Sequence, residues 1–62
     1  MRLNIHVNKE KIVEEGENIE EILEKCGYTI ESVIILRNGS IVIEEDVVNE
    51  DTIEVVPVAS GG

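Results

Sequence analysis

The sequence predicts an α+β domain in which one helix packs on a mixed sheet of four to five strands. Three observations lead to this prediction: strand-like runs lie on both sides of one amphipathic segment, an Asn-Gly pair separates two aliphatic runs, and the chain has only 62 residues. A helix between strands allows one parallel crossover within an otherwise antiparallel set. We therefore expect a single domain over residues 1–58, followed by a flexible tail over residues 59–62.

Two strands are expected to open the fold. Residues 2–7 alternate polar and apolar, so that Leu3, Ile5 and Val7 share one face. The polar residues 8–10 then interrupt the pattern, and residues 11–14 resume a short apolar stretch before Gly16. This arrangement is typical of a hairpin with a half-buried first strand.

One helix follows, with Asn18 as its N-cap. The Asn18 side chain can accept from an unpaired amide of the first turn, and Glu21 can reach back to Asn18. The apolar stripe at helical spacing consists of Ile19, Ile22, Leu23 and Cys26. Gly27 can take the left-handed conformation that ends a helix, so the helix should have roughly 9 residues.

The strongest local signal is Asn38-Gly39, which fits the two positive-φ positions of a type I′ turn. This turn predicts three cross-strand pairs: Leu36 with Ile41 and Ile34 with Ile43 on one face, and Ile35 with Val42 on the other. Both faces are therefore apolar, and a single helix covers only one of them, so the other should expose aliphatic side chains to a partner. A polar connection leads to a last strand over residues 52–58, with Pro57 at an edge or a strand end.

Composition narrows the function. Fourteen acidic residues against five basic ones give a net charge of −9, which disfavours nucleic acid and anionic membrane surfaces and either favours a basic partner or serves solubility alone. No apolar run approaches a membrane span or a signal-peptide core, and the single Cys26 allows no internal disulfide, so we expect a cytoplasmic protein.

No catalytic or metal-binding side chain is assigned, and we expect a partner or substrate of enzymes because so small a chain has little room for an active-site cleft. Cys26 could be a nucleophile, but its place in the helix stripe favours core packing. His6 lacks neighbours that would complete a metal site. Adjacent glutamates such as Glu44-Glu45 are expected to form a solvated acidic face rather than a metal site.

The sequence closes on Ser60-Gly61-Gly62. A carboxylate carried on two glycines is slim and rotationally free, so it can enter another enzyme's active site where a bulkier terminus would clash. We therefore expect the carboxyl carbon of Gly62 to be the reactive atom, with Gly61 providing access.

The order of elements, the Asn38-Gly39 turn and the ending from Val55 to Gly62 together resemble the ubiquitin-like β-grasp sulfur carriers, the ThiS and MoaD group. The resemblance covers nearly the whole chain. Two departures stand out: Glu50-Asp51 replaces the Gly-Asp that often precedes the last strand, and Val56-Pro57-Val58 lacks an aromatic residue. The turn at Glu50 therefore either differs from the family's or holds Glu50 in an ordinary conformation.

The resemblance implies a mechanism. An E1-like adenylyltransferase, using ATP and magnesium, would activate Gly62, and a persulfide donor would convert it to a thiocarboxylate. The sulfur would then pass to a synthase of thiazole or molybdopterin formation or to tRNA thiolation. No cofactor is expected on the carrier itself.

The outward face of the sheet has two readings. Arg37, Ser40 and Glu44 share a side with Ile35, which favours that side facing water, whereas ubiquitin-like geometry favours the reverse. We follow the second reading. The expected partner-binding residues are then Ile34, Leu36, Ile41, Val56, Val58, Ala59 and Ser60.

Two other functions stay open. The protein could be a modifier joined through Gly62 to lysines of target proteins, or a non-covalent interaction module for which the glycines are irrelevant. Diglycine remnants on lysines would identify the first, and indifference to loss of Gly62 would identify the second.

Overall fold

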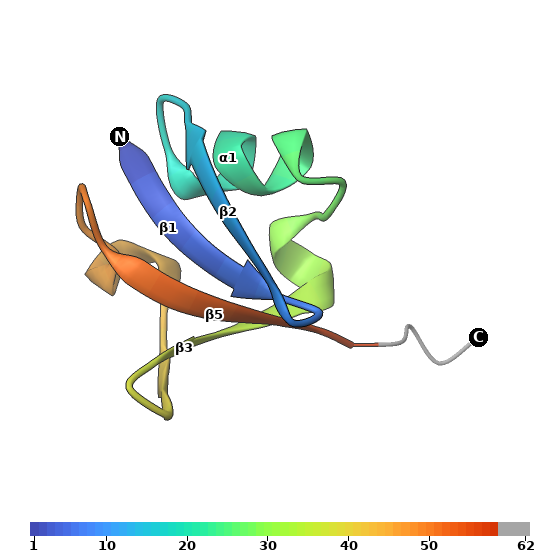
Figure 1. Ribbon diagram of the computed structural model, residues 1–62. Helices are drawn as coiled ribbons and strands as arrows, with labels where there is room; N and C mark the ends of the chain where they lie inside the picture. The colour runs from blue at the N-terminus through green and yellow to red at the C-terminus, as the bar shows by residue number, and fades with distance from the viewer. Residues whose placement is uncertain (59–62) are drawn as a thin grey trace.

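The computed structural model describes residues 1–58 and places one helix on a five-stranded mixed sheet (Figure 1). In chain order the elements are β1 (Arg2–Val7), β2 (Glu10–Glu15), α1 (Ile19–Lys25), the 3₁₀ helix η1 (Ile30–Ser32), β3 (Val33–Arg37), β4 (Ser40–Val42), the 3₁₀ helix η2 (Glu44–Asp46) and β5 (Thr52–Pro57). The predicted α+β fold is confirmed. Residues 59–62, expected to form a flexible tail, lie outside the described residues.

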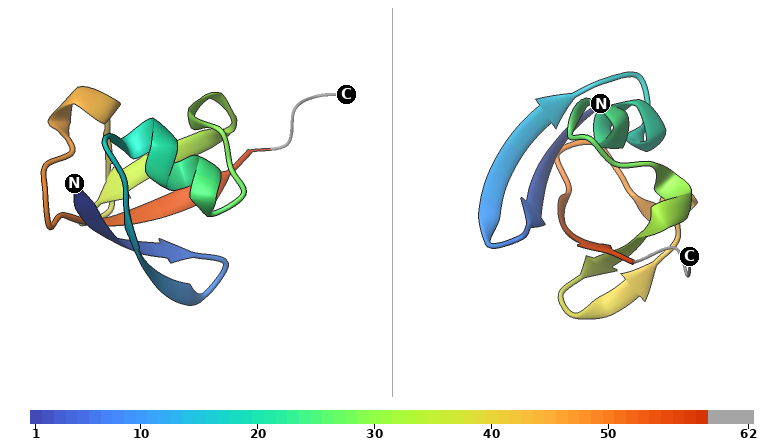
Figure 2. Two further views of the ribbon diagram at one scale, coloured as in Figure 1. Left: turned by 90° about the horizontal axis from the view of Figure 1, so that it is seen from above. Right: turned by 90° about the vertical axis from the view of Figure 1, so that its right-hand side faces the viewer.

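The last strand lies in the middle of the sheet. The strand order is β2-β1-β5-β3-β4, and β5 runs parallel to β1, with Ile5 beside Ile53, and antiparallel to β3. The helix α1 lies across one face of this sheet (Figure 2). Strand β5 is therefore hydrogen-bonded on both sides, and this central position explains why its inward residues are among the most buried of the chain.

The first hairpin closes through a two-residue turn. Asn8 and Lys9 both have positive φ, 50° and 66°, and Val7 pairs with Glu10. Two positive φ values match the right-handed twist of the two strands, so the second strand begins at Glu10, one residue earlier than predicted. Asn8 also donates from Nδ2 to the hydroxyl oxygen of Tyr28 at 3.0 Å.

Helix α1 is seven residues long, shorter than the roughly nine expected, and it begins as predicted. The amide of Glu21 donates to Oδ1 of Asn18 at 2.9 Å, and Gly27 has a φ of 94° just beyond the helix. The expected return contact from Glu21 to Asn18 is wrong. Glu21 Oε1 instead accepts from the amide of Glu17 at 3.3 Å.

Ten aliphatic side chains form the core between sheet and helix. They are Leu3, Ile5, Val7, Ile19, Ile22, Leu23, Ile35, Val47, Ile53 and Val55. The inward alternation of the first strand and the helix stripe are both confirmed, except that Cys26 is only partly buried at the edge of the core. Val47, placed by the sequence in a polar connection, is 5% exposed because η2 turns it inward.

The middle hairpin has the predicted turn, with Asn38 at a φ of 53° and Gly39 at 82°. The expected pairs Leu36 with Ile41 and Ile35 with Val42 are present. The expected pair Ile34 with Ile43 is wrong, because β4 ends at Val42 and the chain turns into η2. On its other side, β3 pairs with β5, where Ile34 lies opposite Val56.

Glu50 adopts a left-handed conformation, with a φ of 68°, so the second of the two alternatives for this turn, an ordinary conformation of Glu50, is wrong. Two contacts to β1 hold it: its amide donates to the carbonyl of Arg2 at 2.7 Å, and its carboxylate pairs with the Arg2 guanidinium at 3.0 Å. A residue with a Cβ pays a steric cost in this region that glycine does not.

Replacing Glu50 with glycine is therefore expected to stabilise the domain. The matched control is Glu50→Ala, which also loses the exposed ion pair to Arg2 but keeps the Cβ. We expect Glu50→Gly to exceed Glu50→Ala in free energy of unfolding by about 1 kcal/mol, measured by urea denaturation. Equal stability of the two variants would show that the left-handed turn carries no strain.

Candidate functional site

The described chain is anchored up to its last residue, first by the sheet and then by η1. Pro57 ends β5 opposite Val33, which confirms its predicted place at a strand end and leaves its missing N–H harmless. Beyond it, the amide of Val58 donates to the carbonyl of Ser32 at 2.8 Å. The predicted reactive residues Gly61 and Gly62, and the predicted partner residues Ala59 and Ser60, lie outside the described residues.

The face of the sheet turned away from α1 carries the aliphatic residues that the sequence placed there. Ile34, Ile41 and Val58 are 38%, 72% and 41% exposed, while Ile35 on the opposite face is buried. Leu36 and Val56 are half-buried. The outward orientation follows from strand alternation, whereas docking of a partner on this face stays a prediction.

Arg37 explains why the two readings of the sheet disagreed. Although it shares a side with the buried Ile35, its side chain is only 32% exposed, because it binds the connection before β5. Its Nη2 and Nε donate to the carboxylate of Asp51 at 2.5 Å and 3.2 Å, and Nη2 also donates to the carbonyl of Asp46 at 2.6 Å. Arg37 therefore forms an ion pair with a residue that is distant in the sequence, and no sequence pattern indicated that Asp51 is its partner.

The Asp51 carboxylate is the centre of this contact. The hydrogen bond from Arg37 is the main cause that lowers the pKa of Asp51 below its ordinary 3.8, and backbone amides of Val48 and Thr52 add to the effect. The Asp51 side chain is 10% exposed, so the pair is shielded from solvent more than an ordinary surface pair. It fixes the β3–β4 hairpin to the start of β5.

Stability is expected to fall in acid through this pair. Because the pKa of Asp51 is lower in the folded state, its contribution is complete above the ordinary 3.8 and is lost as the pH falls through the lower folded pKa. At pH 7, Asp51→Asn should lower the free energy of unfolding by about 1–2 kcal/mol, measured by urea denaturation. The difference between wild type and variant should shrink below pH 4; a constant difference would contradict this.

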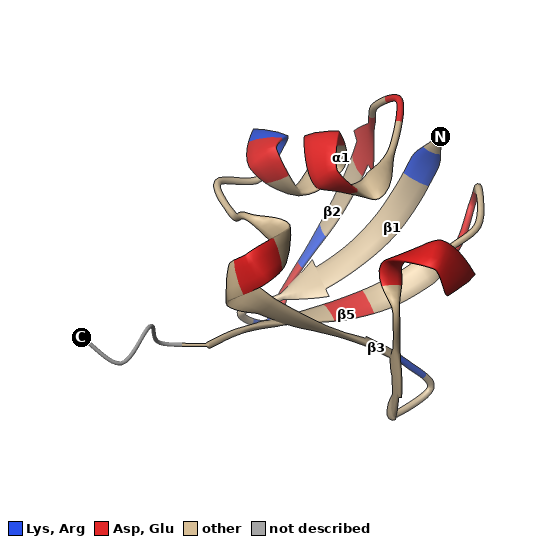
Figure 3. Cartoon of the chain, turned by 180° about the vertical axis from the view of Figure 1, so that it is seen from behind, with Lys and Arg blue, Asp and Glu red and all other residues tan. Residues whose placement is uncertain are grey.

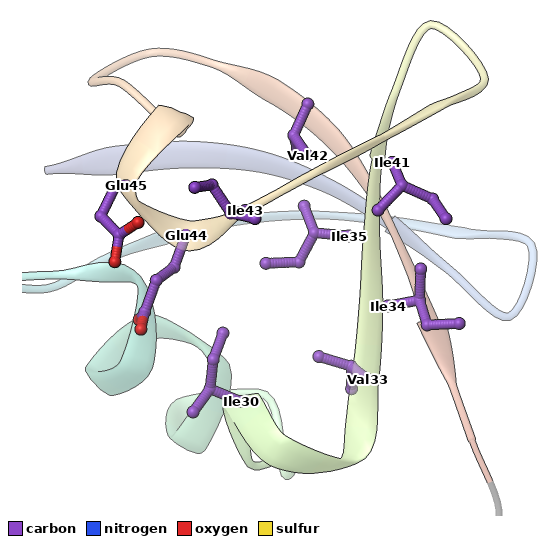
Figure 4. A pocket seen from close by; sticks show the side chains of 9 residues that line it. All are labelled: Ile30, Val33, Ile34, Ile35, Ile41, Val42, Ile43, Glu44 and Glu45. Atoms are coloured by element: carbon purple, nitrogen blue, oxygen red, sulfur yellow. The ribbon is translucent and has the colours of Figure 1, made fainter.

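An apolar hollow of about 440 Å³ lies beside the β3–β4 hairpin (Figure 4). We call it the hairpin groove. It is lined by Ile30, Val33, Ile34, Ile35, Ile41, Val42, Ile43, Glu44 and Glu45. This lining contains no cysteine, histidine, serine or lysine, so the hollow can bind an apolar group, and its only ionisable side chains are the carboxylates of Glu44 and Glu45.

The remaining candidate side chains are placed as follows. Cys26 packs against the core, as predicted, and burial is the main cause that raises the pKa of its thiol, with Glu14 adding to it, so the unreactive protonated form is favoured. His6 is exposed. Within residues 1–58 no three metal-ligating side chains lie together, and no helix there is long and apolar enough to cross a membrane.

Comparison with protein families gives a match that spans almost the whole chain. The model of the ThiS family matches residues 2–62. The chain belongs to the ThiS family. Members of the ThiS family are small sulfur carrier proteins that interact with E1-like activating enzymes and sulfur-transfer partners, so the carrier reading of the sequence is confirmed at this level. The five-stranded sheet with one helix is the β-grasp fold that the resemblance implied.

The sequence analysis predicted Ile34 and Ile41 as partner-binding residues but missed the hairpin groove that they help to line. Its acidic end arises because η2 follows β4 directly and carries Glu44 and Glu45 beside Ile43. The signal was the early end of β4: an apolar residue followed by three acidic ones, Glu44, Glu45 and Asp46, cannot continue a hairpin strand with one buried face. Ile30, which lies in η1, was also missed, because the sequence around it has neither helix nor strand periodicity.

Proposed function

We propose that an E1-like partner uses ATP and magnesium to adenylate the carboxylate of Gly62, and that persulfide sulfur then converts this group to a thiocarboxylate. The thiocarboxylate delivers its sulfur in cofactor biosynthesis or tRNA thiolation. The single observation that carries the proposal is the ThiS family match through residue 62, which includes the Gly61-Gly62 pair.

The chemistry needs activation because a carboxylate is a poor acyl donor. A carboxylate oxygen of Gly62 attacks the α-phosphorus of ATP, and pyrophosphate leaves. The terminal sulfur of a persulfide then attacks the acyl carbon, and AMP leaves with the electron pair of the broken C–O bond. A thiol finally cleaves the S–S bond, so that one sulfur stays on Gly62 as the thiocarboxylate and the other enters a disulfide. All side-chain catalysis belongs to the partners.

The fold supports this role because it anchors the chain directly before the last four residues. Strand β5 is central, and the amide of Val58 is bonded to Ser32, so the chain is anchored immediately before the last four residues. Four residues at full extension span about 14 Å. That length is sufficient for the terminus to enter an enzyme's active site while the domain stays outside.

The first step can be tested without the sulfur steps. Adenylation is reversible, so an E1-like enzyme incubated with ATP, magnesium and labelled pyrophosphate should form labelled ATP only when the carrier is present. A chain lacking Gly62 should give no exchange although it folds, since residues 1–58 contain the whole core. Exchange that is unchanged without Gly62 would show that this carboxylate is not the group activated.

The modifier function shares the same activated carboxylate and differs in the acceptor. The same reaction with persulfide omitted and cell extract added separates the two. Diglycine remnants on lysines after digestion would favour the modifier, whereas a carrier should give none and should form thiocarboxylate once the sulfur donor is restored.

A further inference from the structure

We propose that the hairpin groove binds an extended segment of a partner protein in which lysine or arginine flanks aliphatic residues. The groove combines an aliphatic floor with a carboxylate end, and described residues form both. The groove shares Ile34 and Ile41 with the expected partner-binding face, and binding there can be measured whether or not the carboxylate of Gly62 is activated.

The aliphatic floor of the groove is exposed to solvent. Helix α1 covers the β1–β5 part of the sheet, whereas the hairpin at the other end lies between η1 and η2, and neither closes over it (Figure 4). Ile41 and Ile43 are 72% and 57% exposed. Covering two isoleucines in a groove removes enough apolar surface from water to drive binding of a short segment.

The backbone of β4 favours an extended occupant. Among residues 1–58, β4 pairs only with β3 and lies at an edge of the sheet. Arg37 and Ser40 close the two-residue turn as a hydrogen-bonded pair, so the next pair, Leu36 with Ile41, has its N–H and C=O groups pointing away from each other. Ile41 therefore offers an outward donor and acceptor to an added strand.

The acidic end of the groove specifies the charge of the occupant. Glu44 and Glu45 lie on η2 at one end, and acidic residues colour parts of both η2 and α1 red in Figure 3. Burial, and then Glu20 and Glu45, raises the pKa of Glu44. None of the three ion pairs formed by residues 1–58 includes these glutamates, and Arg37 is already bound to Asp51. A cation from outside would relieve this repulsion.

A second copy of this chain fits the groove poorly. Each copy has a net charge of −9, and its own groove would bring another Glu44-Glu45 pair to the interface. A partner segment with positive charges supplies what a second copy lacks. The groove also lies near the end of β5, since Val33 in its lining pairs with Pro57. A partner bound in the groove would therefore be near the point where the last four residues begin.

The test is a titration of the ¹⁵N-labelled full chain, followed by amide chemical shifts, with the capped peptide Lys-Val-Ile-Val-Lys and its charge-reversed counterpart Glu-Val-Ile-Val-Glu. The lysine peptide should shift the amides of residues 41–45 and bind at least about tenfold more tightly than the glutamate peptide. Absence of shifts, shifts elsewhere, or equal binding of both peptides would overturn the proposal. Shifts at the same residues caused by raising the protein's own concentration would also overturn it, in favour of a dimer.

Two pairs of variants separate the floor from the charges. Ile43→Ser should weaken the lysine peptide about tenfold, while Val13→Ser, on the opposite edge and 60% exposed, should leave it unchanged. Serine suits the N-cap position of η2 that Ile43 occupies, so the fold is retained. The double change Glu44→Gln and Glu45→Gln should weaken binding and its dependence on salt, unlike Glu10→Gln with Glu15→Gln on β2.

A chain lacking Gly62 keeps this test independent of the proposed function. It should bind the lysine peptide as tightly as the full chain does. If the groove proposal fails while labelled pyrophosphate exchange still requires Gly62, only the groove assignment is lost; the reverse result would leave the groove and remove the carrier chemistry.

Discussion

Replacing Gly62 with tryptophan is expected to lower thiocarboxylate formation by roughly a hundredfold or more. The reason is steric: a carboxylate oxygen of residue 62 must approach within bonding distance of the α-phosphorus of ATP in a partner's active site, and an indole beside the carboxylate prevents that approach. The rate of thiocarboxylate formation, followed by mass spectrometry with the activating enzyme, ATP and a persulfide donor, provides the measurement.

The control for this change places the same side chain elsewhere. Val13→Trp adds an indole to the exposed edge strand β2 and should leave the rate within about twofold of wild type. Gly62→Ala, which adds one methyl group, should fall between wild type and Gly62→Trp. If Gly62→Trp reacted as fast as Val13→Trp, a slim terminus would not be required for activation.

Leu23→Ala is expected to have the largest effect on folding. Leu23 is fully buried in the centre of the α1 stripe, and truncation of such a leucine costs about 3 kcal/mol. A domain of this size has a total stability of about 3–9 kcal/mol, so the variant should lose a third or more of it. Urea denaturation followed by circular dichroism measures the loss.

Val13→Ala is the matched control for the core, because Val13 is 60% exposed and should change the stability by less than about 0.5 kcal/mol. A variant at Leu23 that unfolds at the same urea concentration as the variant at Val13 would contradict the placement of α1 on the sheet. The arrangement of residues 1–58 would then be wrong, and with it the position of the hairpin groove.

Local signals in the sequence predicted much of this fold. Asn18 could be recognised as an N-cap and Asn38-Gly39 as a turn because each depends on a few adjacent residues, and both are confirmed. The pair Leu36 with Ile41 followed from the turn length alone. The fold class then followed from the order of elements.

What the sequence did not show depends on contacts between distant residues. Val47 is buried because η2 turns it inward, and Glu50 is left-handed because its amide and carboxylate bind Arg2. The ion pair of Arg37 with Asp51 joins residues that no local pattern connects. The groove was missed for the same reason, since its floor and its acidic end come from different elements.

The candidate site also has one part that the sequence predicted and one part that it could not predict. Gly61 and Gly62 were found from residue type and position alone, and their role stays a proposal because they lie outside the described residues. The outward orientation of Ile34 and Ile41 followed from alternation and is present in the structure. Its use by a partner depends on a second molecule, which one sequence does not specify.

The central claim is that Gly62 carries sulfur, and the most direct measurement is intact mass spectrometry of the protein isolated from its own cells, with fragmentation to locate any change. We predict a population in which one oxygen is exchanged for sulfur and in which every fragment lacking Gly62 has its unmodified mass. Exchange located on another residue, or a terminus that stays a plain carboxylate while the sulfur pathway is active, would contradict the account.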